Sequence, residues 1–145
     1  MNSSALTLFP TAETKPLAQW IIGAAMKVHR ALGCGFLESV YRNALAIELR
    51  SLGIAFETHP TLTVSYEGET VGEFQADLVI ERELSVELKV VEALAPIHSS
   101  QLINYLVATG IDEGLLLNFG AKSLQFRTKT RLPSPVSDIN SQLLP

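Results

Sequence analysis

The segment from Asp77 to Val90 alternates between apolar and polar residues, and this period of two predicts a β-hairpin with two unlike faces. One face collects the apolar side chains, Leu78, Ile80, Leu84, Val86, Leu88 and Val90. The other face collects the polar ones, Asp77, Glu81, Glu83, Ser85, Glu87 and Lys89. One side of the hairpin is therefore apolar and the other is ionisable.

The register of this hairpin brings two carboxylates together. If the turn centres on Arg82, Asp77 lies opposite Glu87, with their Cβ atoms roughly 5 Å apart. Like charges directly opposed destabilise a sheet, so we expect a cation between them. Lys89, two residues further along the same face, is one candidate. A hard divalent cation such as Mg²⁺ is the other, because it prefers carboxylate oxygens and water as ligands.

A charged hairpin face also has an ordinary interpretation. Many antiparallel hairpins present one solvated face, and the hairpin by itself favours that interpretation over chemistry. The D…E-x-K pattern becomes informative only if other polar residues lie where helices should pack.

Two helical segments supply such residues. Glu38 lies in the first turn of a predicted helix, where the helix dipole alone would favour it, and Tyr41 shares its face. In a later helix, His98, Gln101 and Tyr105 recur at spacings of three and four, so they project from one side. A helix edge that meets solvent is the alternative for this second set. Polar sets from three separate elements favour a common site.

Periodicity along the chain predicts the fold class. Apolar residues at helical spacing predict helices over residues 17–32, 37–52 and 96–109, and Gly33 and Gly110 mark two of their ends. Strands are predicted at "IAFET", "TLTVSY", an extended segment ending at Ile80, "LSVELKVV", "GLLLNFG" and "LQFRTKTR". The order α-α-β-β-β-β-α-β-β indicates an α/β fold with a mixed β-sheet flanked by helices.

Length and composition fit one domain. The chain has 145 residues, of which 47% are hydrophobic and 18% charged, so it can bury a proper core. Both ends lack sustained periodicity. We therefore expect a flexible N-terminal tail over residues 1–13, a single domain over 14–131 and a flexible C-terminal tail over 132–145.

Composition also excludes several classes of protein. Cys34 is the single cysteine, which excludes an intramolecular disulfide and a cysteine-based zinc cluster. The lack of a signal-peptide pattern and of a membrane-spanning apolar run predicts a cytoplasmic protein. The formal net charge of -4 argues against a protein that coats nucleic acid by charge alone. A role on nucleic acid would need metal ions or a local basic surface such as "FRTKTR". The alternative for this segment is an edge strand whose charges only prevent aggregation.

Five motifs occur in an order that resembles a known family: "VHRALGCGFLESVYRNALAIELR", "ADLVI", "VELKVVEAL", "PIHSSQLINYL" and "GLLLNFG". They resemble the GxxExxY family, a compact branch of the PD-(D/E)XK nuclease-like superfamily, from Trp20 to Arg127. The name-giving pattern falls on Gly35, Glu38 and Tyr41. Ala76 stands where the superfamily's nominal proline would precede the aspartate, and many members also lack that proline. The resemblance implies a restriction-endonuclease-like core.

The resemblance implies a metal site as well. Asp77 and Glu87 fall on the paired acidic motif and would bind Mg²⁺ or Mn²⁺. The backbone carbonyl of Leu88 would be a third ligand. Glu38 would reach in from its helix as a further ligand or as an acceptor for a bound water.

The remaining site residues receive roles in catalysis and support. Lys89 would complete a catalytic set with the three carboxylates, because it would orient or help to deprotonate the attacking water and offset the charge of the transition state. Gln101 and Tyr105 resemble the QxxxY helix of RecB-like exonucleases and would steady metal-site waters or a phosphate. Tyr41, on the same helix face as Glu38, is a further candidate for support or phosphate contact, and His98 is a further candidate for phosphate contact.

Three hypotheses for function follow. The first is a metal-dependent hydrolase of phosphodiesters in DNA or RNA, and it is favoured by the complete acidic and lysine set. The second is a nucleic-acid or nucleotide binding module that keeps the fold without turnover. The third is a protein interaction subunit whose charged hairpin is only a solvated face. A homodimer is compatible with each, although no surface in the sequence identifies the interface.

Overall fold

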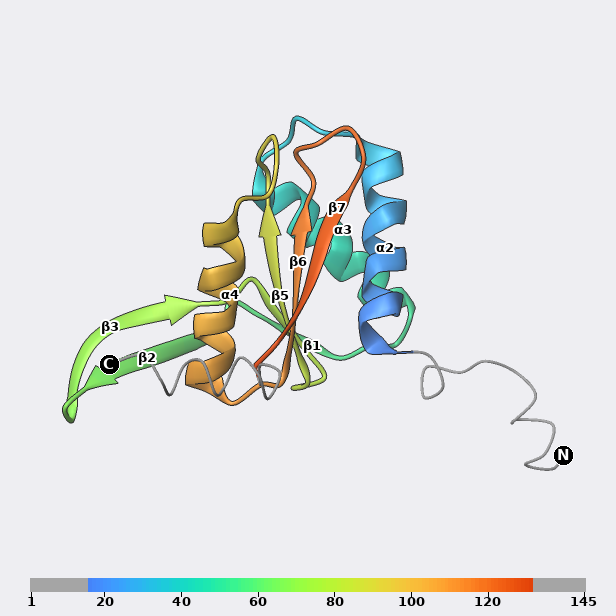
Figure 1. Cartoon of the computed structure of the whole chain (residues 1–145). Helices are drawn as coiled ribbons and strands as arrows, with labels where there is room; N and C mark the ends of the chain where they lie inside the picture. Colours follow the sequence, from blue (N-terminus) through green and yellow to red (C-terminus); the bar gives the residue numbers. More distant parts are fainter. Residues whose placement is uncertain (1–15, 132–145) are drawn as a thin grey trace, which may run out of the picture.

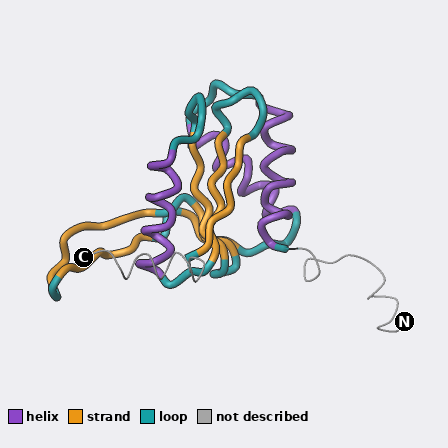
Figure 2. Tube along the Cα trace, viewed as in Figure 1, coloured by secondary structure: helices purple, strands orange, loops and turns teal. Residues whose placement is uncertain are grey.

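The fold is built on one mixed β-sheet with helices on both of its faces (Figure 1). This structure, a computed structural model, describes residues 16–131, so the tails predicted over 1–13 and 132–145 lie outside the described residues. Two helices pack on one face of the sheet and a third covers the other face, which gives three layers (Figure 2).

The observed elements agree closely with the predicted ones. The helices are α2 (Leu17–Leu32), α3 (Glu38–Ser51) and α4 (Pro96–Thr109). The strands are β1 (Phe56–Thr58), β2 (Thr61–Tyr66), β3 (Glu69–Gln75), β4 (Leu78–Ile80), β5 (Leu84–Lys89), β6 (Glu113–Asn118) and β7 (Gln125–Thr130). The α/β class is confirmed. The predicted order is one strand short, because the extended segment ending at Ile80 is two strands, β3 and β4.

The strands form two sheets of very different size. The main sheet has the order β1-β4-β5-β6-β7, and β2 and β3 form a separate two-stranded sheet that projects from the body (Figure 1). Within the main sheet only β5 and β6 are parallel. Helix α4 connects these two strands, as a parallel pair requires.

The break between β3 and β4 originates in the segment that faces it. Pro60 has no N–H to donate to a ladder, and His59 has a left-handed backbone with φ of 51°. At this point the chain keeps only two cross-connections, from His59 N–H to Asp77 O and from Ala76 N–H to Pro60 O. The ladder is therefore interrupted on both sides, and Asp77 is left outside the strand that follows it.

The hairpin of β4 and β5 has the register predicted from its alternation. Leu78 pairs with Val86 and Ile80 with Leu84, which sets Asp77 opposite Glu87. The turn uses left-handed backbone at two residues that are not glycine, Glu81 (φ 53°) and Arg82 (φ 61°). Glu81 offsets this strain through its backbone N–H to Ala55 O and its carboxylate to Ala55 N–H.

Burial follows the predicted parity on both faces of the sheet. The core that packs under α2 and α3 contains every apolar hairpin residue of one parity, namely Leu78, Ile80, Leu84, Val86, Leu88 and the partly buried Val90. On the opposite face, Val79 packs with Tyr105 of α4, and Leu116 packs with Leu102 and Leu106. Each fully buried side chain of this size stabilises the fold by about 1.5–3 kcal/mol.

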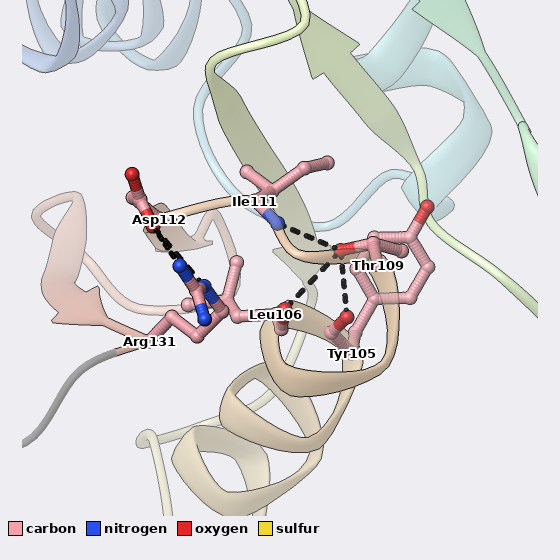
Figure 3. A network of polar contacts seen from close by, with 6 residues as sticks. All are labelled: Tyr105, Leu106, Thr109, Ile111, Asp112 and Arg131. Carbon is pink, nitrogen blue, oxygen red and sulfur yellow. Dashed lines mark hydrogen bonds and ion pairs between the residues drawn. The ribbon is translucent and has the colours of Figure 1, made fainter.

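The C-terminal end of α4 and the loop that follows it are held by polar contacts. Thr109 Oγ1 donates to the backbone oxygen of Tyr105 at 2.8 Å and accepts from Ile111 N–H (Figure 3). Arg131, the last basic residue of the "FRTKTR" segment, pairs with Asp112 at 2.6 Å. Part of the predicted basic concentration is therefore already neutralised. Across residues 16–131, no helix is long and apolar enough to cross a membrane.

The loop that follows Lys89 is fixed by one buried amide. Asn118, at the end of β6, accepts hydrogen bonds from Val91 N–H and Gly120 N–H and donates to Val91 O and Gln125 Oε1. Gly120 lies so close to the Val91 backbone that a Cβ atom there would overlap Val91 N and O. The connection from β5 to α4 therefore has little freedom.

This close approach predicts that Gly120→Ala destabilises the protein. The new methyl group meets backbone that cannot rotate away, so the free energy of unfolding should fall by roughly 1–3 kcal/mol or more. Gly23→Ala is the matched control, because a Cβ at this exposed position in α2 meets nothing within 4 Å. Chemical denaturation should show this control to be more stable than wild type by roughly 0.5–1 kcal/mol. Equal stability of the two variants would contradict the prediction.

Candidate active site

One buried aspartate organises the candidate site. Asp77 lies one residue before β4 and is only 8% exposed. Its Oδ2 accepts a hydrogen bond from the backbone N–H of Leu88 at 2.8 Å. Its own backbone N–H donates to Glu87 Oε1 at 3.1 Å. The predicted pairing of Asp77 with Glu87 is therefore a direct contact, in which each carboxylate binds the main chain of the opposite strand.

A third carboxylate and an arginine enter the site from α3. Glu38 is the first residue of the helix, and Arg42 follows one turn later. Arg42 Nη1 lies 3.4 Å from Asp77 Oδ1 and 3.8 Å from Glu38 Oε2. The cation that contacts Asp77 is thus Arg42, whereas the described residues give Lys89 no ion pair within 4 Å. The i, i+4 spacing of Glu38 and Arg42 was the available signal, but that spacing ordinarily marks a surface pair.

The three carboxylates and Lys89 interact electrostatically. Burial raises the pKa of Glu87 to about 7, with a further contribution from the negative charge of Asp77. Burial and Asp77 likewise raise the pKa of Glu38 to about 7. The positive charge of Lys89 opposes both pKa shifts, so Lys89 acts electrostatically on both carboxyls. The site therefore concentrates acidic groups that resist ionisation together until a cation compensates them.

The donor set suits a hard divalent cation, although the side chains are not arranged around one. Carboxylate oxygens are the ligands that Mg²⁺ and Mn²⁺ prefer. Within residues 16–131, however, no three acidic, histidine or cysteine side chains form a group ready to hold a metal ion. The Asp77 oxygens are engaged by Arg42 and by Leu88 N–H, and the Glu38 carboxylate also faces Arg42. The residues fit a metal by chemistry, and binding one requires these contacts to rearrange.

The charged hairpin face is not a solvated surface. Ser85 has no exposed area and Asp77 very little, while Glu87 and Lys89 are only partly exposed. Helix α4 covers this face through Tyr105, which packs with Ala76 and Val79. The alternative interpretation of a solvated hairpin face is therefore wrong for the residues of the candidate site. It holds only for the exposed turn at residues 81–83.

The three predicted α4 residues differ in their burial and in their contacts. Tyr105 is buried, and its pKa is raised by burial and then by the negative charge of Glu87. Gln101 lies one turn earlier and is exposed. His98 Nδ1 accepts a hydrogen bond from Ala95 N–H and so caps the helix. Of the three residues predicted on this helix, Tyr105 has a described interaction with the acidic groups.

Tyr41 shapes the loop before Glu38. It is fully buried, and its ring stacks on Phe119 with a centroid distance of 4.7 Å. Its hydroxyl donates to Gly33 O and accepts from Phe36 N–H, so both of its hydrogen bonds go to the loop between α2 and α3. This loop also needs the left-handed backbone of Gly35, with φ of 119°. Gly35 and Tyr41 together fix the loop that leads into α3, and α3 then begins at Glu38.

Comparisons with known proteins agree with this architecture. The model of the PD-(D/E)XK nuclease superfamily matches residues 15–130. The crystal structure of SSO0001 is similar at 16% sequence identity and a TM-score of 0.52, over 70% of this chain and 54% of SSO0001, so the chain spans about half of that protein. The crystal structure of the alkaline exonuclease LHK-Exo from Laribacter hongkongensis is similar over 86% of this chain and 88% of that one, at 10% identity and a TM-score of 0.45. No curated protein matches the chain. The superfamily match confirms the predicted restriction-endonuclease-like core.

The raised pKa of Glu87 predicts a pH-dependent loss of stability in the metal-free protein. Below its ordinary pKa of 4.5 the carboxyl is protonated in the folded and the unfolded state, and between 4.5 and about 7 only the folded state keeps the proton. This contribution to stability is therefore lost as the pH rises to about 7. Glu87→Gln, which imitates the protonated carboxyl, should melt several degrees above wild type at higher pH and close to wild type at about pH 4.5.

Thermal melting at a series of pH values, with a chelator present, measures this difference. Glu83→Gln is the control, because it makes the same substitution at an exposed position in the turn of the same hairpin. Melting temperatures of wild type and Glu87→Gln that stay parallel over the whole range would contradict the prediction.

Proposed function

Since the chain belongs to the PD-(D/E)XK nuclease superfamily, we propose that it hydrolyses phosphodiester bonds of nucleic acid with the help of Mg²⁺ or Mn²⁺. The contact between Asp77 and Glu87, on a hairpin that also presents Lys89, carries this proposal. The burial of these carboxyl groups supports the proposal, because ionised carboxylates are costly to bury and contribute nothing to stability unless a cation neutralises them. A bound cation would supply that positive charge.

Four groups would hold the cation. Asp77 and Glu87 would supply carboxylate oxygens from facing strands, and Glu38 would supply a third from α3. The Leu88 carbonyl is the fourth candidate, since the Leu88 backbone already lies beside Asp77 through its N–H. When bound, the cation would lower the pKa of a coordinated water and neutralise charge on the phosphoryl oxygens.

Lys89 is the proposed catalytic base or water-orienting group. It lies two residues after Glu87 on the same face of β5, and its charge acts on both Glu38 and Glu87. As an ammonium, Lys89 would orient the attacking water by a hydrogen bond and offset the negative charge that grows on the phosphoryl oxygens, whereas the role of base would require its neutral amine. Its loop is fixed by Asn118, so Lys89 is presented by a rigid connection.

The helical residues have supporting roles. Tyr105 lies on the helix that covers this hairpin face, and the charge of Glu87 acts on it, so it would steady that carboxyl or a water bound to it. Gln101, exposed one turn earlier on α4, is available to a phosphate of the substrate. His98 contributes through the capping of α4, with its second ring nitrogen left for the phosphate contact expected from its helix face.

We also infer that the chain belongs to the GxxExxY branch of the superfamily. The physical role of the three motif residues supports this inference. Gly35 permits the turn, Tyr41 closes it from inside the core, and Glu38 is thereby presented toward Asp77. A glycine, a glutamate and a tyrosine at this spacing form one structural unit that serves the site.

A non-catalytic nucleic-acid binding module is the second candidate. Two observations favour it. Arg42 engages Asp77, and residues 16–131 contain no preformed group of three metal ligands. An arginine that permanently replaced the cation would preserve the fold and remove the chemistry. The next two experiments separate the two candidates.

Calorimetric titration of Mn²⁺ is the first test. Wild type should bind Mn²⁺, and Asp77→Asn should lose that binding because one of its anionic ligands is gone. Asp112→Asn is the matched control, since Asp112 pairs with Arg131 outside the acidic site, and it should bind as wild type does. Absence of binding in wild type would contradict a cation site in the free protein.

Cleavage of labelled single-stranded and double-stranded DNA and RNA is the second test. Wild type should cut at least one of these in Mn²⁺ and none in a chelator. Lys89→Met should retain Mn²⁺ binding and lose a factor of about 10²–10³ in rate, as is usual when one group that stabilises transition-state charge is removed. Lys27→Met, at an exposed position of α2, should cut normally. Mn²⁺ binding without cleavage of any substrate would favour the non-catalytic module.

A further inference from the structure

Arg42 occupies an unusual position for a residue so near a candidate metal site. Its side chain is 14% exposed, and it faces the Asp77 side chain, which is 11% exposed. It also lies within 4 Å of Glu38, the residue one turn before it on α3. Arg42 thus joins two of the three carboxylates through a single guanidinium group.

A guanidinium in this environment must have an anionic partner. Arginine keeps its charge at all accessible pH values, so a desolvated Arg42 cannot become neutral as a lysine can. Asp77 and Glu38 have the converse need, since nearby carboxylates destabilise each other without a cation. Of the described residues, Arg42 is the one that forms ion pairs with them. It is therefore the compensating charge of the metal-free site.

The same oxygens are the ones a metal ion needs. Arg42 faces Asp77 Oδ1 and Glu38 Oε2, while Asp77 Oδ2 is taken by Leu88 N–H. Mg²⁺ binds carboxylate oxygens at about 2.0–2.1 Å, which would bring it within a few ångströms of the guanidinium in the present geometry. Two like charges at that distance in a partly buried site repel strongly. Metal and guanidinium therefore compete for one position.

We propose that Arg42 is the resident cation of this acidic site, which it stabilises in the absence of metal, and that a divalent cation displaces it on binding. This inference rests on the proposed metal-dependent function. It explains why the carboxylates are close together and yet form no ready-made metal-binding group. The alternative is a structural ion pair that persists when the metal is bound.

The two possibilities differ in thermodynamic linkage. If Arg42 contacts the carboxylates only without metal, then its removal weakens the metal-free state and leaves the metal-bound state unchanged. The free energy of unfolding lost without metal must then reappear as a gain in Mn²⁺ binding free energy. A persistent ion pair would lower stability with and without metal alike.

Arg42→Gln tests this linkage. The variant should melt below wild type in a chelator, should bind Mn²⁺ about tenfold more tightly by calorimetry, and should reach the wild-type melting temperature at saturating Mn²⁺. Arg50→Gln is the matched control, because it removes the same charge from an exposed position on the same helix. It should change the Mn²⁺ affinity much less.

Each outcome decides the proposal. A stability gap that persists at saturating Mn²⁺, or an affinity that is unchanged or weaker, overturns displacement and leaves the metal site itself standing. Binding by Arg42→Gln but not by wild type overturns displacement, because Arg42 would then be a permanent occupant of the site, as in the non-catalytic module. Absence of Mn²⁺ binding in both proteins overturns displacement together with the metal-dependent function. If Arg42→Gln does not fold in a chelator, refolding by Mn²⁺ supports displacement, and failure to refold overturns it.

Discussion

The arrangement of the whole site depends on how the β4–β5 hairpin ends. At its open end the two strands are joined by side chains that bind main chain, with the Asp77 carboxylate on Leu88 N–H and the Glu87 carboxylate on Asp77 N–H. The carboxylates therefore take the place of backbone carbonyls in the ladder. A displacement of either strand would separate them, so the register that buries the core also sets the geometry of the acidic groups.

Three different compensations are available to these buried charges. Protonation is one, since the pKa values of Glu38 and Glu87 are raised to about 7. The guanidinium of Arg42 is the second. Under the proposed function, a divalent cation would be the third. All three act on the same carboxyl groups between α3 and the hairpin. One therefore reduces the need for the others. The site is therefore an acidic cluster whose negative charge can be neutralised in more than one way, and not a preformed set of metal ligands.

The sequence predicts the parts of this arrangement that depend on periodicity. Alternation, together with a turn centred on Arg82, sets Asp77 opposite Glu87, and helical spacing places Tyr105 on the face of α4 that covers them. Arg42 could not be predicted, because its pairing with Asp77 depends on how α3 crosses the sheet. The separation of β3 from β4 was missed for a similar reason, since the residues responsible, His59 and Pro60, lie in the opposite segment.

The negative charge of the three carboxylates limits the order in which a cation and a phosphate could bind at this site. A phosphodiester is an anion, and three carboxylates that face it repel it as long as they are ionised and uncompensated. Compensation by Arg42 neutralises part of that charge, but it also engages the oxygens that would hold a catalytic cation. Under the proposed function, a cation would therefore have to reach the carboxylates before, or together with, the substrate phosphate. Because the chain has a net charge of -4, the attraction of nucleic acid would then depend on the charges of the site more than on the protein as a whole.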